Sequence, residues 1–580
     1  RFFDVLNLIG GLSLFLFGMH VMGTALEKRA GGQLKALLGK LTGSKLAGFL
    51  TGLGVTAVIQ SSSATTVMVV GFVNSGLMTL KQAIHVIMGA NVGTTVTAWL
   101  LSLAGLDGSS LFIQLLKPSS FTPVLALVGI VLIMAGKERQ KDTGSILLGF
   151  AVLMYGMEAM SGAVSPLRTS ESFRSLLLLF SNPILGVLAG AVFTAIIQSS
   201  SASVGVLQAL ASTGAITMAS AIPIIMGQNI GTCVTAMLSS IGANTNAKRA
   251  AVVHLSFNII GTAVMLVVFC AVRAMLQPAF LSLPATAATI AVAHSLFNIV
   301  CTAILMPASG LLEKLSIALV PDKSTHHADG PMLDERLLAT PAIAVERCRV
   351  VALDMAQEAS DALNLSIESL RDASPALGEK IRALEDSTDR YEDTLGTYLL
   401  TLAQRPMTAN DSDESGRLLH LISDFERIAD HAVNILESAE ELHAKKITLP
   451  ADAQQELTTL EHAVQEIIRL SLAAFRTGDL SAASRVEPLE QVIDGLKGQL
   501  RTRQIARLQK GACSLETGFI WTDLLTNFER VADHCSNIAG CMLETQHKSL
   551  DLHEYLDGVK QSAPEFRRDY EAYSQQYALV

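Results

Sequence analysis

With 580 residues, the chain is far longer than the roughly 100–200 residues of one domain, so it should hold several domains. Half of its residues are hydrophobic and only 16% are charged, a composition typical of proteins that cross membranes. The charges are segregated, with 8 acidic and 17 basic residues up to position 320 and 44 acidic and 26 basic residues after it. An apolar, basic front therefore precedes an acidic, soluble back half, and this acidity argues against nucleic-acid binding.

Apolar segments long enough for spanning helices recur through the front of the chain. Such a helix needs roughly 17–25 residues, and the candidates lie near 5–23, 82–104, 121–136, 144–164, 221–241, 251–276 and 286–306. Two longer apolar stretches, 46–76 and 184–214, are interrupted at their middles by the polar run QSSS. This pattern predicts two re-entrant hairpins, because a polar break inside a membrane must be buried in protein or face a wet cavity.

The front is a tandem duplication with a spacing of 138 residues. The motifs MGANVGTTVTA and MGQNIGTCVTA keep this spacing, as do both QSSS runs. The pairs in this register are Gly18 and Gly156, Gln60 and Gln198, Gly76 and Gly214, and Gly89 and Gly227. Each copy contains three spans and one hairpin, so an odd number of crossings inverts the second copy. The two hairpin tips are then expected to meet near the midplane.

The duplicated motifs carry polar side chains that could bind an ion. Gln and Ser offer both donors and acceptors, so a QSSS cluster can surround an oxyanion or coordinate a hard cation. Helix packing through small serines is the alternative reading. Asn91 with Thr94, and Asn229 with Thr232, form a second duplicated set. An asparagine inside a span needs a ligand or a hydrogen-bond partner, and both readings stay open.

A third pair of motifs, HLSFNI at 254–259 and HSLFNI at 294–299, places His and Asn four residues apart on one helix face. Functional contacts and structural hydrogen bonds are equally compatible with this pattern.

The back half has the periodicity of amphipathic helices. Six main helices are expected near 341–373, 376–404, 411–444, 453–477, 480–509 and 514–547, with a charged tail helix near 549–577. Short polar connections between them predict two three-helix bundles in series.

Each predicted bundle contains E-x-x-x-D pairs, which place two carboxylates on one helix face. The segments DFERIADHAVNI and NFERVADHCSNI repeat at a spacing of 103 residues, and another such pair precedes each of them. Converging carboxylates repel one another, so Mg²⁺, Ca²⁺, Mn²⁺ or iron would be a natural counter-charge. The alternative is solvated acids neutralised by neighbours such as Arg427 and Arg530. The candidate metal ligands are Glu385, Asp389, Glu426 and Asp430 in the first bundle and Glu490, Asp494, Glu529 and Asp533 in the second.

The segments TAVIQSSSATT, MGANVGTT, TAIIQSSSAS and IPIIMGQNIGT resemble the type II sodium–phosphate cotransporter family over roughly residues 1–310. The back half resembles PhoU proteins over about 341–545. The resemblance implies an all-α polytopic membrane protein of two inverted repeats with re-entrant hairpins, followed by a soluble PhoU-like pair of three-helix bundles. The expected domains are repeats 1–137 and 138–276, an additional transmembrane helix and exit 277–320, a linker 321–340, the PhoU-like domain 341–548 and a tail 549–580.

The resemblance also assigns roles to residues. The phosphate-binding candidates are Gln60, Ser61, Ser62, Ser63, Gln198, Ser199, Ser200 and Ser201. The sodium-binding or supporting candidates are Thr65, Asn91, Thr94, Ser203, Asn229 and Thr232.

The function expected from this resemblance is sodium-coupled transport of inorganic phosphate, with alternating access at the QSSS motifs and regulation by a cytoplasmic PhoU-like domain. Phosphate export, or a membrane-tethered phosphate sensor without transport, are the alternatives. Enzyme motifs such as a P-loop, HExxH or GxSxG are absent from the sequence, so no enzyme is expected. The expected coupling ion is Na⁺, with a divalent metal or iron in the PhoU-like domain. The expected location is a bacterial inner membrane, with a homodimer and phosphate-signalling proteins as further candidate partners.

Overall fold

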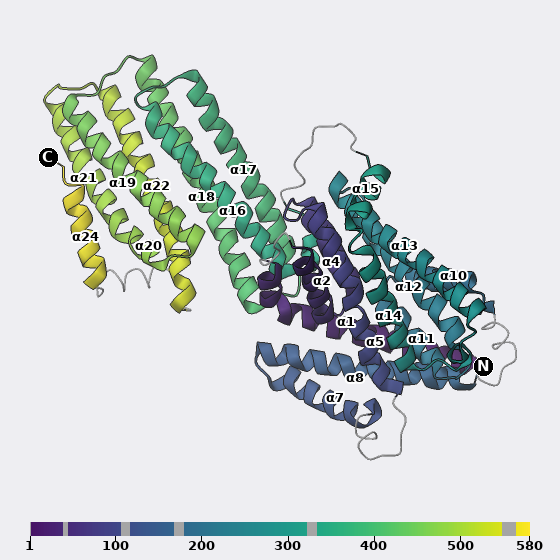
Figure 1. Ribbon diagram of the computed structural model, residues 1–580. Coiled ribbons are helices and arrows are strands. Elements are labelled where there is room, and N and C mark those ends of the chain that lie inside the picture. Colours follow the sequence, from purple (N-terminus) through teal and green to yellow (C-terminus); the bar gives the residue numbers. More distant parts are fainter. Residues whose placement is uncertain are drawn as a thin grey trace. The chain divides into compact units, whose positions relative to one another are not determined.

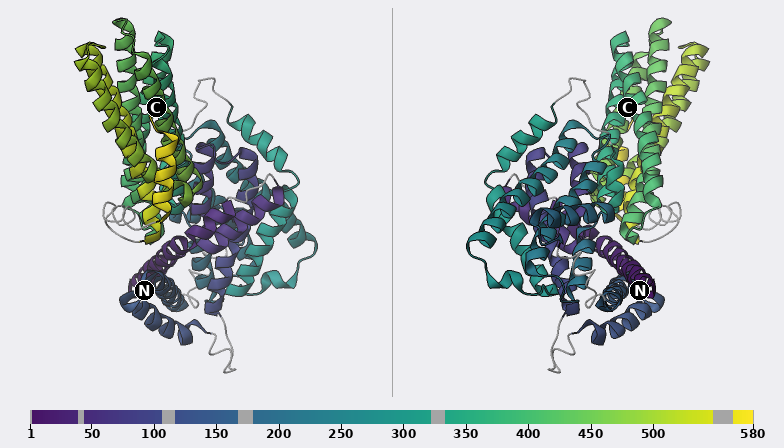
Figure 2. Two further views of the ribbon diagram at one scale, coloured as in Figure 1. Left: turned by 90° about the vertical axis from the view of Figure 1, so that its left-hand side faces the viewer. Right: turned by 90° about the vertical axis from the view of Figure 1, so that its right-hand side faces the viewer.

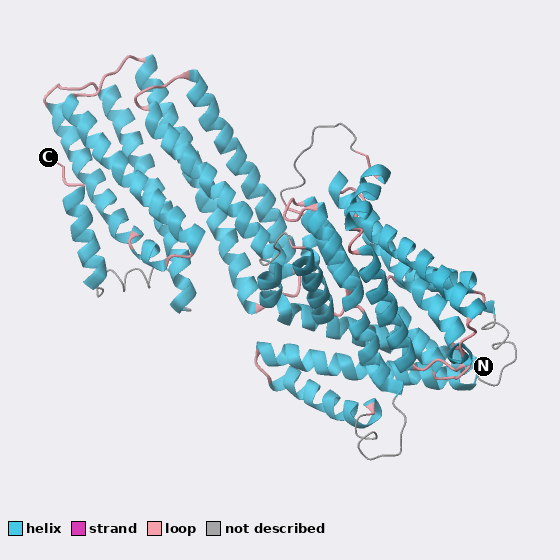
Figure 3. Cartoon of the chain, viewed as in Figure 1, coloured by secondary structure: helices cyan, strands magenta, loops and turns pink. Residues whose placement is uncertain are grey.

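A computed structural model describes residues 2–38, 44–105, 117–166, 179–321, 333–547 and 564–579. These described residues form helices, turns and loops, with no strand among them (Figure 3). They divide into two compact units, Arg1–Ala344 with Arg405–Ala409, and Val345–Gln404 with Asn410–Val580. The predicted all-α class is confirmed.

The first unit holds the apolar helices. Six of its helical segments are long and apolar enough to cross a membrane, which confirms a multi-pass membrane protein: Phe3–Arg29, Leu80–Gly105, Arg139–Val164, Met218–Ser239, Thr245–Met275 and Ala287–Leu305. The helices of this unit are α1 (Phe2–Leu38), α2 (Lys45–Ile59), α3 (Ser62–Asn74), α4 (Leu80–Gly93), α5 (Thr95–Ser102), α7 (Pro118–Ala135), α8 (Glu138–Val164), α10 (Pro183–Ile197), α11 (Ser200–Ala211), α12 (Met218–Ser239), α13 (Thr245–Met275), α14 (Ala287–Leu305) and α15 (Ser309–Leu319) (Figure 1).

Both re-entrant hairpins are present as pairs of short apolar helices, α2 with α3 and α10 with α11. Each pair is broken at the glutamine of its QSSS run, which adopts the left-handed conformation, with φ of 61° at Gln60 and 58° at Gln198. The next serine then caps the second half-helix. The side chain of Ser61 accepts from the amide of Ala64, and that of Ser199 accepts from the amide of Ala202, each at 3.2 Å. The polar run therefore ends one helix and starts the next.

Glycines let each hairpin lie against the following helix of its own repeat. A Cβ added to Gly52 of α2 would lie 1.9 Å from the carbonyl oxygen of Val86 in α4. A Cβ added to the equivalent Gly190 of α10 would lie 2.1 Å from the carbonyl oxygen of Ile224 in α12. No real Cβ fits at such distances, so backbone-to-backbone contact is built into both copies. The same close packing in both copies follows from the duplication in the sequence.

The segment expected to be a polar linker contains a buried turn. Residues Glu335–Ala339 form a 3₁₀ turn, η4, whose Leu337 is fully buried. Leu337 lies against Gly71 of α3, where a Cβ would sit 3.1 Å from the leucine Cδ2. The chain is therefore fastened to the first hairpin immediately before it continues into the second unit.

The second unit is a set of long helices that run side by side in all views (Figures 1 and 2). Its helices confirm the predicted pair of three-helix bundles, except that the segment near 480–509 is broken at Arg485. They are α16 (Pro341–Ser369), α17 (Pro375–Ala403), α18 (Ala409–Ala444), α19 (Ala451–Thr477), α20 (Leu480–Ser484), α21 (Val486–Gln509), α22 (Leu515–His547) and α24 (Pro564–Gln576). The start of the predicted tail helix, 549–563, lies outside the described residues.

The duplicated segments DFERIADH and NFERVADH pair reciprocally across this unit. His431 of α18 contacts Asn527 of α22 at 2.8 Å, and His534 of α22 contacts Asp424 of α18 at 2.9 Å. The two imidazole rings lie 5.6 Å apart. Equivalent residues of the two copies thus exchange equivalent contacts, which gives the unit local pseudo-twofold symmetry.

Candidate functional site

The tips of the two hairpins touch. The hydroxyl of Ser63, in the first QSSS run, donates to the backbone carbonyl of Gln198, in the second, at 3.2 Å. The structure therefore brings together two motifs that are separated by 138 residues in the sequence. The surroundings differ between the copies, because Gln60 is only 8% exposed whereas Gln198 is exposed.

Neighbouring hydroxyls hold each hairpin closed. Thr56 donates to Thr65 at 3.0 Å across the break of the first hairpin, and Thr194 donates to Ser203 at 2.7 Å across that of the second. Thr65 and Ser203, predicted as sodium or supporting residues, therefore each have a structural hydrogen bond beside the QSSS run.

Thr97 contributes to this region and was not identified from the sequence. Its hydroxyl donates to Oε1 of Gln60 at 2.9 Å, and the residue is 2% exposed. The equivalent Thr235 of the second copy has a buried hydroxyl without a partner among the described residues. The duplication register of 138 would have revealed this pair, because both threonines occupy the same position in the motifs MGANVGTTVTA and MGQNIGTCVTA.

In the glycine-rich motifs, MGANVGTTVTA and MGQNIGTCVTA, Asn91 lies inside α4 and Thr94 caps its end, whereas Asn229 and Thr232 both lie inside α12. Thr94 and Thr232 are nearly buried, and each donates its hydroxyl hydrogen to a carbonyl of its own helix at 3.0 Å. Asn229 donates to the carbonyl of Ile225 at 3.0 Å, while Oδ1 of Asn91 lies 3.3 Å from Nε2 of His254. The two copies thus share position but differ in partners.

A polar cluster fastens η4 to the end of α3. Asn74, 1% exposed, donates to the carboxylate of Asp334 and accepts from the backbone amide of Asn244 at 2.7 Å. Asp334 also pairs with Arg336 at 3.0 Å. The guanidinium of Arg336 in turn donates to the carbonyl oxygens of residues 239 and 241 at the end of α12. One segment therefore bridges the first hairpin and the α12–α13 turn.

Three carboxylates of the first bundle come close enough to share a cation. In the described part of the chain, oxygens of Asp389, Glu392 and Glu426 lie within 4.8 Å of one another. Burial, with the nearby charges of Asp430 and Glu392, raises the pKa of Glu426 to about 7. Asp389 and Glu426 were predicted as metal ligands from the sequence, whereas Glu392 was not. The predicted ligands Glu385 and Asp430 lie outside this group. Carboxylate oxygens of this kind suit Mg²⁺, Ca²⁺ or Mn²⁺.

The matching position in the second bundle is neutralised by the protein itself. Lys497, whose position in its bundle matches that of Glu392, pairs with Glu529 at 2.9 Å. Arg530 pairs with Asp533 at 3.4 Å, as the equivalent Arg427 pairs with Asp430 at 3.7 Å in the first bundle. The difference between the bundles is therefore Lys497, which relieves in the second bundle the repulsion that would favour a metal in the first.

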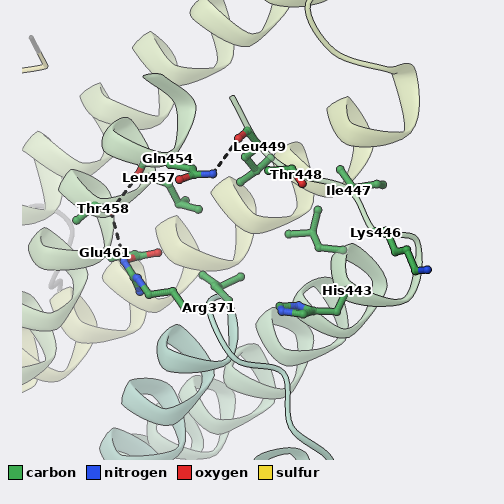
Figure 4. Close-up of a pocket in the computed structure, with 12 residues that line it drawn as sticks. Arg371, His443, Lys446, Ile447, Thr448, Leu449, Gln454, Leu457, Thr458 and Glu461 are labelled. Atoms are coloured by element: carbon green, nitrogen blue, oxygen red, sulfur yellow. Dashed lines mark hydrogen bonds and ion pairs between the residues drawn. The ribbon is translucent and has the colours of Figure 1, made fainter. Parts of the chain in front are cut away.

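A separate cavity of about 600 Å³ lies at one end of the second unit (Figure 4). Arg371 pairs there with the buried Glu461 and contacts Thr458 at 3.3 Å, while His443 and Lys446 line the opposite side. Glu461 already balances the charge of Arg371. A charged ligand is therefore less needed in this cavity than at the carboxylate cluster. None of the predicted site residues lines it.

Family models match both halves of the chain. The Na⁺/Pi-cotransporter model matches residues 14–162 and 152–282, and the PhoU domain model matches residues 352–439 and 457–542. Each model matches twice, in agreement with the two internal duplications.

Individual relatives match nearly the whole chain or a part of it. A Salmonella typhimurium protein named "Putative inorganic phosphate export protein YjbB" is 25% identical over 565 residues, covering 95% of this chain and 99% of the relative. YqeW of Bacillus subtilis is 30% identical over 310 residues, covering 53% of this chain and 96% of the relative. Sodium-dependent phosphate transport protein 2A of Rattus norvegicus is 42% identical over 99 residues, covering 17% of this chain and 15% of the relative.

Proposed function

The chain belongs to the Na⁺/Pi-cotransporter family and carries two PhoU domains, and from this premise we propose that it carries inorganic phosphate across a membrane together with Na⁺. The contact between Ser63 and Gln198 is the observation that carries this proposal. It joins two polar helix breaks from opposite repeats, which is the arrangement expected of a transport site near the middle of the bilayer.

The tips supply the groups that an oxyanion needs. Serine hydroxyls and glutamine amides donate hydrogen bonds, and the start of each second half-helix adds backbone amides and a positive dipole end. The candidate phosphate ligands are therefore the two QSSS runs. Na⁺ would bind at oxygen atoms beside them and lower the cost of bringing an anion into a medium of low dielectric constant.

The exposure difference between Gln60 and Gln198 supports alternating access. In an inverted repeat, one copy closes its side of the site while the other leaves its side open. Rocking of the repeats would then exchange the environments of the two glutamines.

The PhoU half is proposed to regulate transport from the cytoplasmic side of a bacterial inner membrane. The attachment of η4 to Asn74 supports this proposal, because the segment that enters α16 also holds the end of a hairpin helix. A divalent cation at Asp389, Glu392 and Glu426 is proposed to bind this half, and a homodimer or a separate phosphate-signalling protein is a proposed partner.

Flux measurements in proteoliposomes test the proposal. We expect radiolabelled phosphate to accumulate only when a sodium gradient is imposed, and sulfate to be a poor substitute. Uptake that is indifferent to sodium would contradict the coupling, and phosphate binding without flux would favour a membrane-tethered sensor.

Export is a second candidate, because a relative that matches 95% of this chain is named for phosphate export. The same pathway can run in either direction, so the prevailing ion and phosphate gradients decide. Proteoliposomes loaded with labelled phosphate separate the two directions: faster efflux than uptake at matched gradients would favour export.

A further inference from the structure

The duplicated asparagines Asn91 and Asn229 present opposite ends of their amides. Nδ2 of Asn229 donates to the carbonyl of Ile225 at 3.0 Å, and only the nitrogen of an amide can donate to a carbonyl. Oδ1 of Asn229 consequently remains available, and it makes no hydrogen bond to another described residue. In the first copy, Oδ1 of Asn91 faces Nε2 of His254 at 3.3 Å, and its Nδ2 is buried without a partner among the described residues.

His254 is held in position by the second copy. The residue is 1% exposed, and its backbone carbonyl lies 3.5 Å from the thiol of Cys233 in α12. Asn258, one turn along α13, donates to the same carbonyl at 3.0 Å and to the sulfur of Cys233 at 3.3 Å. α13 therefore connects the glycine-rich motif of one repeat to that of the other, with the imidazole placed against Asn91.

A buried amide nitrogen without a partner is destabilising, so a ligand that accepts a hydrogen bond from Asn91 would be favoured. N–H groups bind anions, whereas an amide oxygen binds a hard cation such as Na⁺. We propose that Asn91 donates to phosphate and is held for this by His254, while Asn229 presents Oδ1 to Na⁺. This inference rests on the proposed function and makes His254 a positioning residue that discriminates between the two ions.

His294 provides a matched control for His254. It lies on α14, is also 1% exposed and is also followed by an asparagine four residues later, Asn298. Neither of its ring nitrogens has a partner among the described residues. Replacing His294 therefore removes an equally buried imidazole, but it breaks no hydrogen bond to Asn91 or Asn229.

The experiment measures the apparent KM for phosphate and for Na⁺ in proteoliposomes containing the full chain. Asn91→Asp removes the amide donor, and we expect it to raise the phosphate KM about tenfold or more while changing the sodium KM little. Asn229→Asp keeps an oxygen at the same place, so the phosphate KM should stay within about threefold while the sodium KM shifts. His254→Leu should reproduce the effect of Asn91→Asp, and His294→Leu should not.

His254→Gln tests positioning, because its amide nitrogen can still donate to Asn91. We expect this variant to recover most of the phosphate affinity that His254→Leu loses. Equal changes of both KM values in Asn91→Asp and Asn229→Asp, or a His254→Gln variant as impaired as His254→Leu, would overturn the inference while leaving transport intact. If the unmodified protein neither carries phosphate nor responds to sodium, the proposed function fails first and this inference fails with it.

Discussion

The side-chain amide of Asn74, at the end of a hairpin helix, donates to the carboxylate of Asp334 at 2.5 Å, across 260 residues of sequence. Both side chains are 1% exposed. A buried carboxylate is tolerated only where charge and hydrogen bonds compensate it, and Arg336 supplies the charge at 3.0 Å. The segment just before the PhoU half is therefore tied to the α2–α3 hairpin by interactions that are expensive to break.

Asp334→Ala should weaken the first unit, because Asn74 loses the carboxylate that accepts its amide hydrogen and Arg336 loses its charge partner. Breaking a buried pair typically costs about 3–5 kcal/mol, and we expect the lower end here because Arg336 is partly exposed. Thermal unfolding of the full chain in detergent measures this. Glu440→Ala is the control, since it removes an exposed ion pair with Arg382 and should cost at most about 1 kcal/mol. Equal losses of stability in both variants would contradict this account of the buried cluster.

Gln60→Gly and Gln198→Gly should separate backbone strain from ligand binding. A left-handed residue other than glycine costs roughly 1–2 kcal/mol, so Gln198→Gly should unfold at the same or a higher temperature. Gln60→Gly should gain less, because it also removes the acceptor of the buried Thr97 hydroxyl. Phosphate transport should nevertheless be lost, because the amide side chain is gone. Gln277→Gly is a control at another position of positive φ, 42°, outside both motifs, and should leave transport unchanged. Full transport by the first two variants would refute a ligand role for these glutamines.

Gly52→Ala should disrupt the packing of α2 on α4, because its Cβ would meet the carbonyl oxygen of Val86 at 1.9 Å. Overpacking of a tight interface typically costs about 1–3 kcal/mol, and a clash with backbone belongs at the upper end. Gly54→Ala is the matched control in the same helix, where a Cβ meets nothing within 4 Å. Melting temperatures of the purified variants should differ clearly; if Gly52→Ala were as stable as Gly54→Ala, the close helix approach would be wrong.

The hairpins could be predicted from sequence because a polar run inside an apolar segment is a local signal, and its duplication shows that the signal is not accidental. The turn at η4 could not, since Leu337 lies in a polar stretch and becomes buried only against Gly71, far away in the chain. The pairing of Asn91 with His254 likewise depends on tertiary packing between α4 and α13. The periodicity of a sequence shows which residues share one face of a helix. It does not show which other helix packs against that face.

The candidate metal ligands illustrate the same limit. The E-x-x-x-D pattern includes Asp389 and Glu426, but it occurs in both bundles and so predicts a metal site in each. The structure adds Glu392 to the first group, and the matching Lys497 supplies a positive charge in the second. A single exchange of charge between the two copies therefore separates a candidate cation site from an internal ion pair. A motif that omits this position cannot show the difference.

Cation binding should accordingly depend on Glu392 and Lys497 in opposite ways. Calorimetric titration of the full chain with Mn²⁺ should find one site per chain in the unmodified PhoU half, since a lysine pairs with a carboxylate in the second group where the first has Glu392. Glu392→Lys should abolish that site by placing an ammonium among the carboxylates, and Lys497→Glu should create a second one. Glu392→Gln is the control that removes charge without adding a cation, and it should weaken binding less than Glu392→Lys. Unchanged stoichiometry in both charge-exchange variants would rule out this pair of sites.

The raised pKa of Glu426 adds a dependence on pH. Because the folded protein holds the Glu426 proton up to a pKa of about 7, against an ordinary value of 4.5, this group stabilises the metal-free fold below about pH 4.5 and loses that contribution as the pH rises through 7. The metal-free protein should therefore melt at a lower temperature at pH 8 than at pH 6, and added Mn²⁺ should reverse the difference because it replaces the lost proton. Glu426→Gln, which cannot ionise, should flatten this part of the pH profile. A profile that keeps its slope in Glu426→Gln would assign the titration to another group.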